Sequence, residues 1–241
     1  MDQQLKQLQD WISESRHIVF FGGAGVSTES GIPDFRSVDG LYHQQYAFPP
    51  ETILSHSFFE RNPEEFYRFY RSKMLFPQAR PNAAHWKLAE LEAAEKLTAV
   101  VTQNIDGLHQ AAGSKTVYEL HGSVHRNHCM KCRRFYGLDF LLETGGVPRC
   151  PACGGVVKPD VVLYEECLDE TTMVGAVEAI AGADMLIIGG TSLAVYPAAG
   201  LIRYYRGNRL ALINKSATPY DREAGLVINA SLGEVLGAIR V

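Results

Sequence analysis

Two pairs of cysteines constrain this chain more than any other feature. Cys129 and Cys132 are separated by two residues, Cys150 and Cys153 repeat that spacing, and seventeen residues lie between the pairs. Four thiolates at this spacing can close a tetrahedron around one metal ion, which leaves no position open for water or substrate. The pattern therefore predicts one structural zinc ion, with iron as the main competing metal, and the chemistry must lie elsewhere.

Two disulfides or a redox-active C-x-x-C are alternatives for these cysteines, and the rest of the sequence disfavours both. Residues 1–15 do not have the charged and apolar segments of a secretory signal, and no apolar run approaches the roughly eighteen residues of a membrane-spanning helix. We therefore expect a cytoplasmic protein with reduced thiols and no membrane partner. The fifth cysteine, Cys167, has no partner in the pattern and is expected to be inert.

Length and charge limit the remaining function classes. The 241 residues suffice for one good-sized core plus an insertion, and 46% hydrophobic with 21% charged residues is ordinary globular composition. The formal net charge of −4 gives no overall basic surface. A zinc-ribbon nucleic-acid-binding module is therefore a weak alternative, and we expect no direct nucleic-acid partner.

Apolar runs alternate with helical patterns along most of the chain. The expected strands are residues 17–22, 97–102, 161–164, 185–189, 210–213 and 226–228. Continuous apolar runs are typical of parallel strands covered on both faces, and helices such as the one opened by Asp169 lie between them. The pattern predicts an α/β fold with a doubly wound, Rossmann-like parallel sheet, in which ligands bind outside the carboxyl ends of the strands.

Two glycine turns follow expected strands. Gly23-Ala24-Gly25 comes after the first strand, and Gly190 begins a second turn after residues 185–189. Small residues let backbone N–H groups approach a pyrophosphate, so two such turns in one sheet argue for a dinucleotide. The third glycine of G-x-G-x-x-G is missing and Pro33 shortens the following helix, which disfavours a hydride-transferring dehydrogenase.

Two insertions interrupt the alternation of strands and helices. Residues 37–82 are rich in aromatic side chains, with Asn62-Pro63 as a helix cap and first turn, and residues 122–159 contain the four cysteines. We expect both to pack together as a small domain, a helical insert plus the zinc module, with a cleft beside it. The nucleotide-binding domain would comprise residues 1–36, 83–121 and 160–241.

Seven motifs give the chain a resemblance to sirtuins. They occur in the family's order and spacing: Gly23-Ala-Gly-Val-Ser27, Gly31-Ile-Pro-Asp-Phe-Arg36, Thr102-Gln-Asn-Ile-Asp106, Leu120-His-Gly122, the two cysteine pairs, Lys158-Pro-Asp-Val-Val162 and Gly190-Thr-Ser-Leu193. Each motif is weak alone, but the seven in order span nearly the whole chain, which is similar to small bacterial-type sirtuins. It departs from the family at Gly22, where threonine is frequent, and at Tyr164-Glu165-Glu166, where many members read phenylalanine-glycine-glutamate.

The resemblance implies an NAD-dependent protein-lysine deacetylase that consumes NAD as a co-substrate. In the family, nicotinamide leaves, the acyl oxygen attacks the ribose, and a ribose hydroxyl, freed of its proton by a base, attacks the acyl carbon. The products are free lysine, nicotinamide and O-acetyl-ADP-ribose. The family's base maps onto His121 in Leu120-His-Gly122. Histidine suits this role, because an imidazole with an ordinary pKa of about 6.5 is largely neutral at working pH. Composition alone does not distinguish His121 from His85 or His109, and an NAD-dependent mono-ADP-ribosyltransferase is the alternative that shares the co-substrate.

The resemblance also implies a role for individual residues. Asn104 is the second expected catalytic residue and reaches the ribose with Gln103, while Asp106 and the backbone of Ile105 hold the nicotinamide carboxamide. Phe35 is expected to cover the reacting ribose and exclude water. The other implied NAD contacts are phosphate-binding Ala24, Thr28 and Arg36, phosphate- and ribose-binding Thr191 and Ser192, ribose-binding Asn214, and Leu232 near the adenine.

The implied substrate is an acetylated protein bound as an extended peptide. Backbone pairing with residues 162–166 and 192–196 would be largely blind to peptide sequence. Sirtuins that prefer succinyl-lysine carry Tyr-x-x-Arg in the aromatic helix, whereas Tyr67 is followed here by Tyr70. The resemblance therefore implies a preference for acetyl-lysine. The sequence does not define the oligomeric state, and a monomer is compatible with it.

Overall fold

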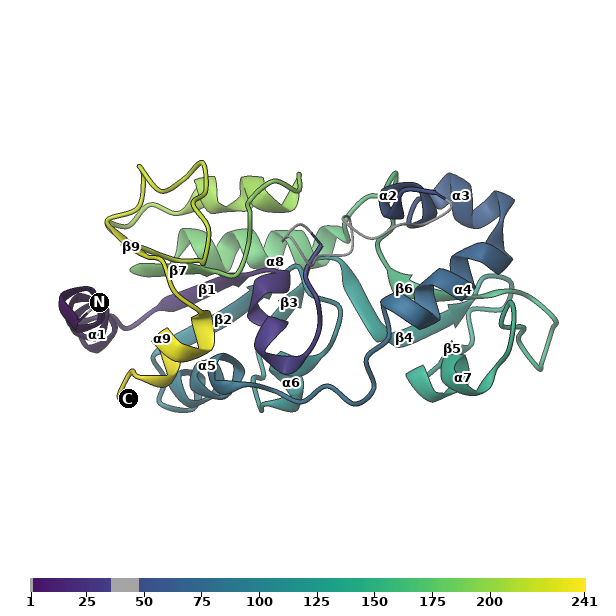
Figure 1. Ribbon diagram of the computed structural model, residues 1–241, viewed down its shortest axis with the longest axis horizontal. Helices are drawn as coiled ribbons and strands as arrows, with labels where there is room; N and C mark the ends of the chain where they lie inside the picture. The colour runs from purple at the N-terminus through teal and green to yellow at the C-terminus, as the bar shows by residue number, and fades with distance from the viewer. Residues whose placement is uncertain (1, 36–47) are drawn as a thin grey trace.

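The computed structural model describes residues 2–35 and 48–241, which form two lobes side by side (Figure 1). The larger lobe is built on a six-stranded parallel sheet in the order β3-β2-β1-β7-β8-β9. Its strands are β1 (Ile18–Gly22), β2 (Leu97–Thr102), β3 (Val117–Glu119), β7 (Met185–Gly189), β8 (Arg209–Ile213) and β9 (Leu226–Ile228). The order along the chain reverses between β1 and β7, as in doubly wound nucleotide-binding folds, so the predicted fold class is confirmed.

Helices cover both faces of this sheet because the strands are apolar on both faces. One face packs on α1 (Asp2–Glu14), α5 (Ala83–Ala93) and α9 (Leu232–Gly237), with Phe20 and Ile187 among the strand residues in that cluster. The other face packs on α8 (Glu170–Ala181) and the 3₁₀ helix η4 (Ala198–Tyr204), against neighbours such as Phe21 and Ile188. Successive side chains of a strand point to opposite faces, so one apolar run supplies both layers of the core.

The smaller lobe contains a three-stranded antiparallel sheet in the order β5-β4-β6. Its strands are β4 (Gly122–Cys129), β5 (Phe135–Tyr136) and β6 (Val157–Val161), and its helices are α2 (Pro50–Ile53), α3 (His56–Arg61), α4 (Pro63–Lys73) and α7 (Leu138–Glu143). One hydrophobic cluster joins Phe66 and Tyr70 of the first insertion to Val124 and Leu141 of the second. The aromatic residues of the first insertion therefore form a core with the cysteine-containing segment.

Polar residues begin two helices as the sequence predicts. Asp169 Oδ1 accepts a hydrogen bond of 2.8 Å from the backbone N–H of Thr172 at the start of α8. Asn62 Oδ1 accepts one of 3.4 Å from Glu65 at the start of α4, where Pro63 takes the first position. Both caps bond backbone N–H groups that have no partner inside the helix.

The strand expected at residues 161–164 is wrong. β6 ends at Val161 and pairs with β4 in the small sheet, and the chain then turns, since the N–H of Glu166 donates to the carbonyl of Leu163 at 3.0 Å. The large sheet contains β3 instead, which has three half-buried residues at its edge. So short a strand produces no apolar run that a sequence pattern could reveal.

Candidate active site and metal centre

The two glycine turns meet where the strand order reverses. The N–H of Gly25 donates to the carbonyl of Gly190 at 2.8 Å, and a Cβ on Gly25 would lie only 2.7 Å from the Cα of Gly190. Gly190 itself has φ of 60°, a left-handed conformation that favours glycine. The sequence therefore folds into two turns packed backbone to backbone, whose small residues leave room for a ligand at the carboxyl ends of β1 and β7.

A cleft of about 1340 Å³ opens at these turns, between the two lobes. Its lining includes residues of the smaller lobe such as Met74 and Val124. It also includes all the candidate catalytic and NAD-binding residues within the described part of the chain: Ala24, Thr28, Phe35, Gln103, Asn104, Ile105, Asp106, His121, Thr191, Ser192, Asn214 and Leu232. Arg36 lies outside the described residues.

The imidazole of His121 is held by the backbone of Gln103. Nδ1 of His121 lies 3.0 Å from the Gln103 carbonyl oxygen, which can only accept, so Nδ1 carries the proton in the neutral ring. Nε2 is then left with its lone pair. Burial lowers the pKa of His121, and the hydrogen bond to Gln103 opposes this shift only in part. The ring is therefore neutral at pH 7, with one nitrogen able to take a proton.

A chain of polar side chains connects Asn104 to Asp106. Nδ2 of Asn104 donates to the Ser27 hydroxyl at 3.1 Å, and that hydroxyl donates to Asp106 Oδ2 at 2.6 Å. The N–H of Leu108 donates to Asp106 Oδ1 at 2.9 Å. Burial raises the pKa of Asp106, although its hydrogen bonds from Ser27 and Leu108 oppose the shift. Asp106 is therefore a half-buried, oriented carboxyl group in the cleft.

Asn214 and Gln103 fix the second glycine turn around Thr191. Asn214 Oδ1 accepts from the Thr191 N–H at 3.0 Å and its Nδ2 donates to the Thr191 carbonyl at 2.6 Å. Gln103 Nε2 donates to the Thr191 hydroxyl at 3.0 Å. Asn214, expected as a ribose contact, therefore has both ends of its amide bonded to the turn, while Ser192 is exposed beside it.

The first turn and the two 3₁₀ helices after it, η1 (Ala24–Val26) and η2 (Thr28–Ser30), have anchors that the motifs do not reveal. Asn82 Nδ2 donates to the carbonyl of Val26 at 2.8 Å and to Ser30 Oγ at 2.9 Å. Glu29 accepts from the N–H of Gly233, next to Leu232 in α9, at 2.7 Å. Asn82 is recognisable from sequence only as a residue type that caps helices, and it does cap α5.

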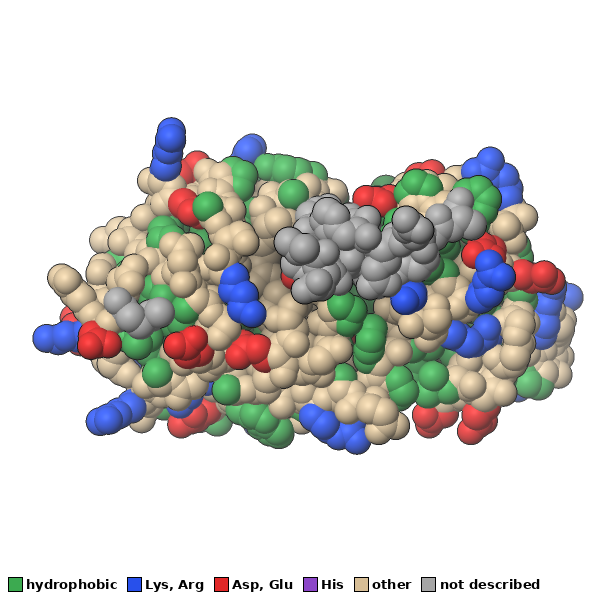
Figure 2. Space-filling model, in the orientation of Figure 1, with side chains coloured by type: hydrophobic (Ala, Val, Ile, Leu, Met, Phe, Trp, Pro, Cys, Tyr) green, Lys and Arg blue, Asp and Glu red, His purple; other side chains and the backbone are tan. Residues whose placement is uncertain are grey.

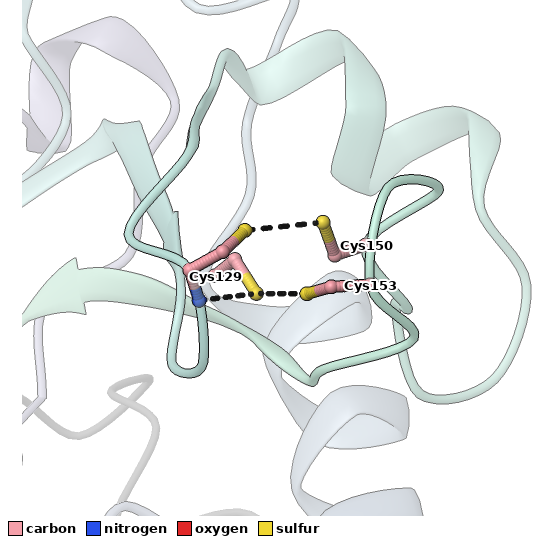
Figure 3. Close-up of side chains that lie close together, drawn as sticks. Cys129, Cys150 and Cys153 are labelled. Atoms are coloured by element: carbon pink, nitrogen blue, oxygen red, sulfur yellow. Dashed lines mark hydrogen bonds between the residues drawn. The ribbon is translucent and has the colours of Figure 1, made fainter.

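The four cysteines come together in the smaller lobe (Figure 3), and none of them lines the cleft. Their sulfur atoms all lie within 4.8 Å of one another, with Cys129 to Cys153 at 3.4 Å and Cys132 to Cys150 at 3.6 Å. The two sulfur atoms of a disulfide are about 2.05 Å apart, whereas two ligands of a zinc tetrahedron with Zn–S bonds of about 2.3 Å have sulfur atoms about 3.8 Å apart. The arrangement fits one structural zinc ion.

A hydroxyl supports this cluster from outside. The Tyr136 hydroxyl lies 3.0 Å from Cys150 Sγ. This contact is the largest of several that together lower the pKa of Cys150 to about 6, with the backbone of Ala152 and the neighbouring thiols adding to the shift and burial opposing it. Metal ligands need thiolates, so Tyr136 favours the form of Cys150 that binds a metal.

Charges are mixed over the face drawn in Figure 2, where acidic and basic side chains are interspersed on both lobes. Within the described part of the chain, no helix is both long and apolar enough to cross a membrane.

Comparison with known proteins identifies the family. The Sir2 family model matches residues 23–197, and the chain belongs to this family. It is 62% identical to an NAD-dependent protein deacetylase of Clostridium perfringens over 99% of both chains, and 59% identical to one of Clostridium acetobutylicum over 98% of both. The resemblance predicted from the seven motifs is therefore confirmed.

Solved structures agree with this assignment. A Sir2 protein bound to a p53 peptide and NAD⁺ is 41% identical, with a TM-score of 0.85 and coverage of 96% of this chain and 95% of that one. Another Sir2 structure, which holds a deacetylated p53 peptide and 3′-O-acetyl ADP ribose, is 40% identical with a TM-score of 0.88, at the same coverage.

Proposed function

We propose that this chain is an NAD-dependent protein-lysine deacetylase that releases nicotinamide and O-acetyl-ADP-ribose. The observation that carries the proposal is His121, a neutral imidazole in the same cleft as the two glycine turns, with Nδ1 bonded and Nε2 free to accept a proton. The names of the relatives support the same activity. NAD supplies the ribose that receives the acetyl group, together with a leaving group, nicotinamide.

In this proposal, His121 removes a proton from a ribose hydroxyl through Nε2. The Gln103 carbonyl keeps the other ring proton on Nδ1 and stabilises the imidazolium that forms. Asp106, oriented by Ser27 and the N–H of Leu108, binds the nicotinamide carboxamide, and Asn104 contacts the ribose.

The remaining roles in the cleft follow the geometry of the turns. Ala24 and Thr28 in the first turn and Thr191 in the second bind the phosphates, with Arg36 assigned there from sequence alone. Ser192 binds the far ribose, Asn214 holds the Thr191 turn beside it, Leu232 lies by the adenine, and Phe35 covers the reacting ribose. The shared position of the described residues around one cleft supports their assignments.

We further propose how the substrate reaches this cleft. Acetylated proteins bind as extended peptides against residues 162–166 and 192–196, and residues 37–82 and 122–159 form one small domain beside the NAD-binding domain. Cytoplasmic location is supported by the cysteine cluster, because a thiolate site needs a reducing compartment. We propose that the protein acts without a nucleic-acid partner, and a monomer is compatible with the sequence.

The test is mass spectrometry of an acetyl-lysine peptide incubated with the protein, with and without NAD. We expect the acetyl group to be lost only with NAD, and O-acetyl-ADP-ribose to appear in equal amount. A peptide that gained ADP-ribose and kept its acetyl group would show a mono-ADP-ribosyltransferase instead.

A further inference from the structure

A tight turn borders the cleft where the substrate peptide is proposed to pair. Residues 163–166 form it, closed by the bond from the Glu166 N–H to the Leu163 carbonyl. Glu165 has φ of 75° in this turn, a conformation that residues other than glycine rarely adopt. Many sirtuins have glycine at this position, so the turn in this chain needs support from its surroundings.

Glu165 ties the turn to the start of α3. One of its carboxylate oxygens accepts from the backbone N–H of Ser57 at 2.9 Å and the other from the Ser57 hydroxyl at 3.0 Å. Two backbone bonds lie beside this contact: the N–H of Tyr164 donates to Leu54 and the N–H of His56 donates to Tyr164, each at 3.0 Å. A carboxylate at a helix N-terminus also meets unpaired N–H groups and the favourable end of the helix dipole.

Glu166 ties the same turn to His56 and Lys158. His56 Nδ1 lies 2.9 Å from Glu166 Oε1, and Lys158 Nζ lies 3.2 Å from Oε2, which also accepts from the N–H of Leu163 at 2.9 Å. Burial favours the neutral form of Glu166, but these partners lower its pKa overall, so the group is ionised. His56 is the half-exposed member of this cluster, and its Nε2 lies 3.4 Å from Glu60.

The outer edge of the turn is open. The backbone N–H and carbonyl of Glu165 form no hydrogen bond with any of the described residues, and the residue is exposed. An extended peptide could therefore pair with this edge while the side chains of Glu165 and Glu166 are bonded behind it.

We propose that His56 is a positioning residue for the acyl-peptide substrate, because its imidazole, through Glu166, holds the turn of residues 163–166 in the conformation that pairs with the peptide. The inference rests on the proposed deacetylase function. The positioning role concerns the peptide and not NAD. Loss of His56 should weaken peptide binding and leave NAD binding unchanged, since none of the partners of His56 belongs to the two glycine turns.

The contact also gives peptide binding a dependence on pH. The charged groups that face His56 are Glu60 on its own helix, Glu166 in the turn and Lys158 on β6. The hydrogen bond that His56 donates to Glu166 raises the pKa of His56 above its ordinary 6.5, with the negative charges of Glu166 and Glu60 adding to the shift and burial and Lys158 opposing it. The charge-assisted contact is thus complete at low pH and weakens as pH rises through the raised pKa.

The test measures two dissociation constants. The Kd of a labelled acetyl-lysine peptide is measured by fluorescence anisotropy without NAD, and the Kd of NAD is measured by calorimetry. In His56→Ala we expect the peptide Kd to rise about three- to tenfold at pH 7, because a half-exposed charge-assisted bond is lost. The Kd for NAD should not change. His56→Asn keeps a donor near the position of Nδ1, so it should restore peptide affinity and remove the weakening of peptide binding that the wild type shows as pH rises above 6.5. His17→Ala, at an exposed histidine in the other lobe, is the matched control.

Three results would overturn the inference: an unchanged peptide Kd in His56→Ala, an equal loss of NAD affinity, or no recovery in His56→Asn. Deacetylation by the wild-type protein, measured in parallel, separates this outcome from failure of the proposed function. If the wild-type protein deacetylates the peptide but the His56 variants have the same peptide Kd, only the positioning role is refuted.

Discussion

Two buried histidines should make the protein unstable in mild acid. His85 in α5 and His109 in α6 (Leu108–Ala111) have ring centroids 4.7 Å apart, and both side chains are almost completely buried. The Asn82 backbone N–H donates to His85 Nδ1 at 3.2 Å, which requires a neutral acceptor nitrogen. His85 Nε2 and both nitrogens of His109 have no hydrogen-bond partner among the described residues. A charge on either ring would therefore be poorly compensated.

The size of the effect follows from the pKa values. Burial lowers the pKa of His85 to about 4 and that of His109 to about 3, from 6.5 in the unfolded chain. Folded pKa values below the unfolded value give stability that is complete above pH 6.5 and declines as pH falls toward the folded values. When the pH falls from 7 to 5, the free energy of unfolding therefore decreases by about 2 kcal/mol for each histidine, or about 4 kcal/mol for the pair. Domains are typically stable by about 5–15 kcal/mol, so this loss is measurable.

His109→Phe tests the argument, because phenylalanine keeps a ring in the site and removes the titration. The free energy of unfolding is measured by urea denaturation at pH 7 and pH 5. Whatever the substitution does at pH 7, the difference between the two pH values should shrink by about 2 kcal/mol. His17→Ala, at an exposed site, should leave that difference as in the wild type. An unchanged difference in His109→Phe would refute the reasoning.

The remaining predictions concern catalysis and the metal. His121→Ala should keep NAD binding and lose more than about a hundredfold in deacetylation rate, the scale of a lost general base; near-normal turnover would exclude that role. Removing the metal from the cysteine cluster should lower melting temperature and activity together, and a metal-free protein that keeps its melting temperature would contradict a structural role. Asp106→Asn should weaken both NAD turnover and the exchange of labelled nicotinamide into NAD, whereas undiminished exchange would assign the carboxamide to another residue. On one peptide, kcat/KM should be higher for acetyl-lysine than for succinyl-lysine. The Tyr67 hydroxyl is bonded to the Val157 carbonyl and the Tyr70 hydroxyl is buried, so neither is available to the succinyl carboxylate, which would lose on the order of several kcal/mol of hydration if unpaired. Equal kcat/KM values would show that a cation reaches the acyl group.

The parallel sheet could be predicted because each long strand is a continuous apolar run. Residues 18–22 and 185–189 are buried at every position, and no other strand of similar length within the described residues is. The run at residues 161–164 misled the prediction, because apolar content does not say which sheet a strand joins. Val161 ends β6, held there by its register with Gly122 of β4. Pairing partners are a property of the folded chain.

The site was predictable where a motif carries the chemistry and unpredictable where a tertiary contact does. His121 was chosen by resemblance; its tautomer depends on the Gln103 carbonyl, eighteen positions away in sequence. Asn82 holds the two 3₁₀ helices after the first glycine turn across more than fifty residues, and no motif marks it for that contact. Asn214 lines the cleft, as expected for a ribose contact, and its amide also bonds the backbone of Thr191, a contact that no motif indicates.

The segment Tyr164-Glu165-Glu166 illustrates how a departure from a family pattern acts through local conformation. The turn demands a left-handed residue at position 165, which glycine adopts at no steric cost, and glutamate adopts it here with its carboxylate bonded to Ser57. The hydrogen bonds between the Glu165 carboxylate and the start of α3 thus offset the strain of the left-handed conformation. The edge of the turn that faces the peptide still consists of backbone N–H and carbonyl groups. Substitution of Glu165 should consequently change how firmly the peptide-facing edge of the turn is held. It should therefore change peptide affinity and not the preference among acyl groups. Glu165→Gly distinguishes the two: we expect a changed peptide Kd with an unchanged ratio of acetyl to propionyl turnover, and a changed ratio would place the Glu165 side chain against the acyl group.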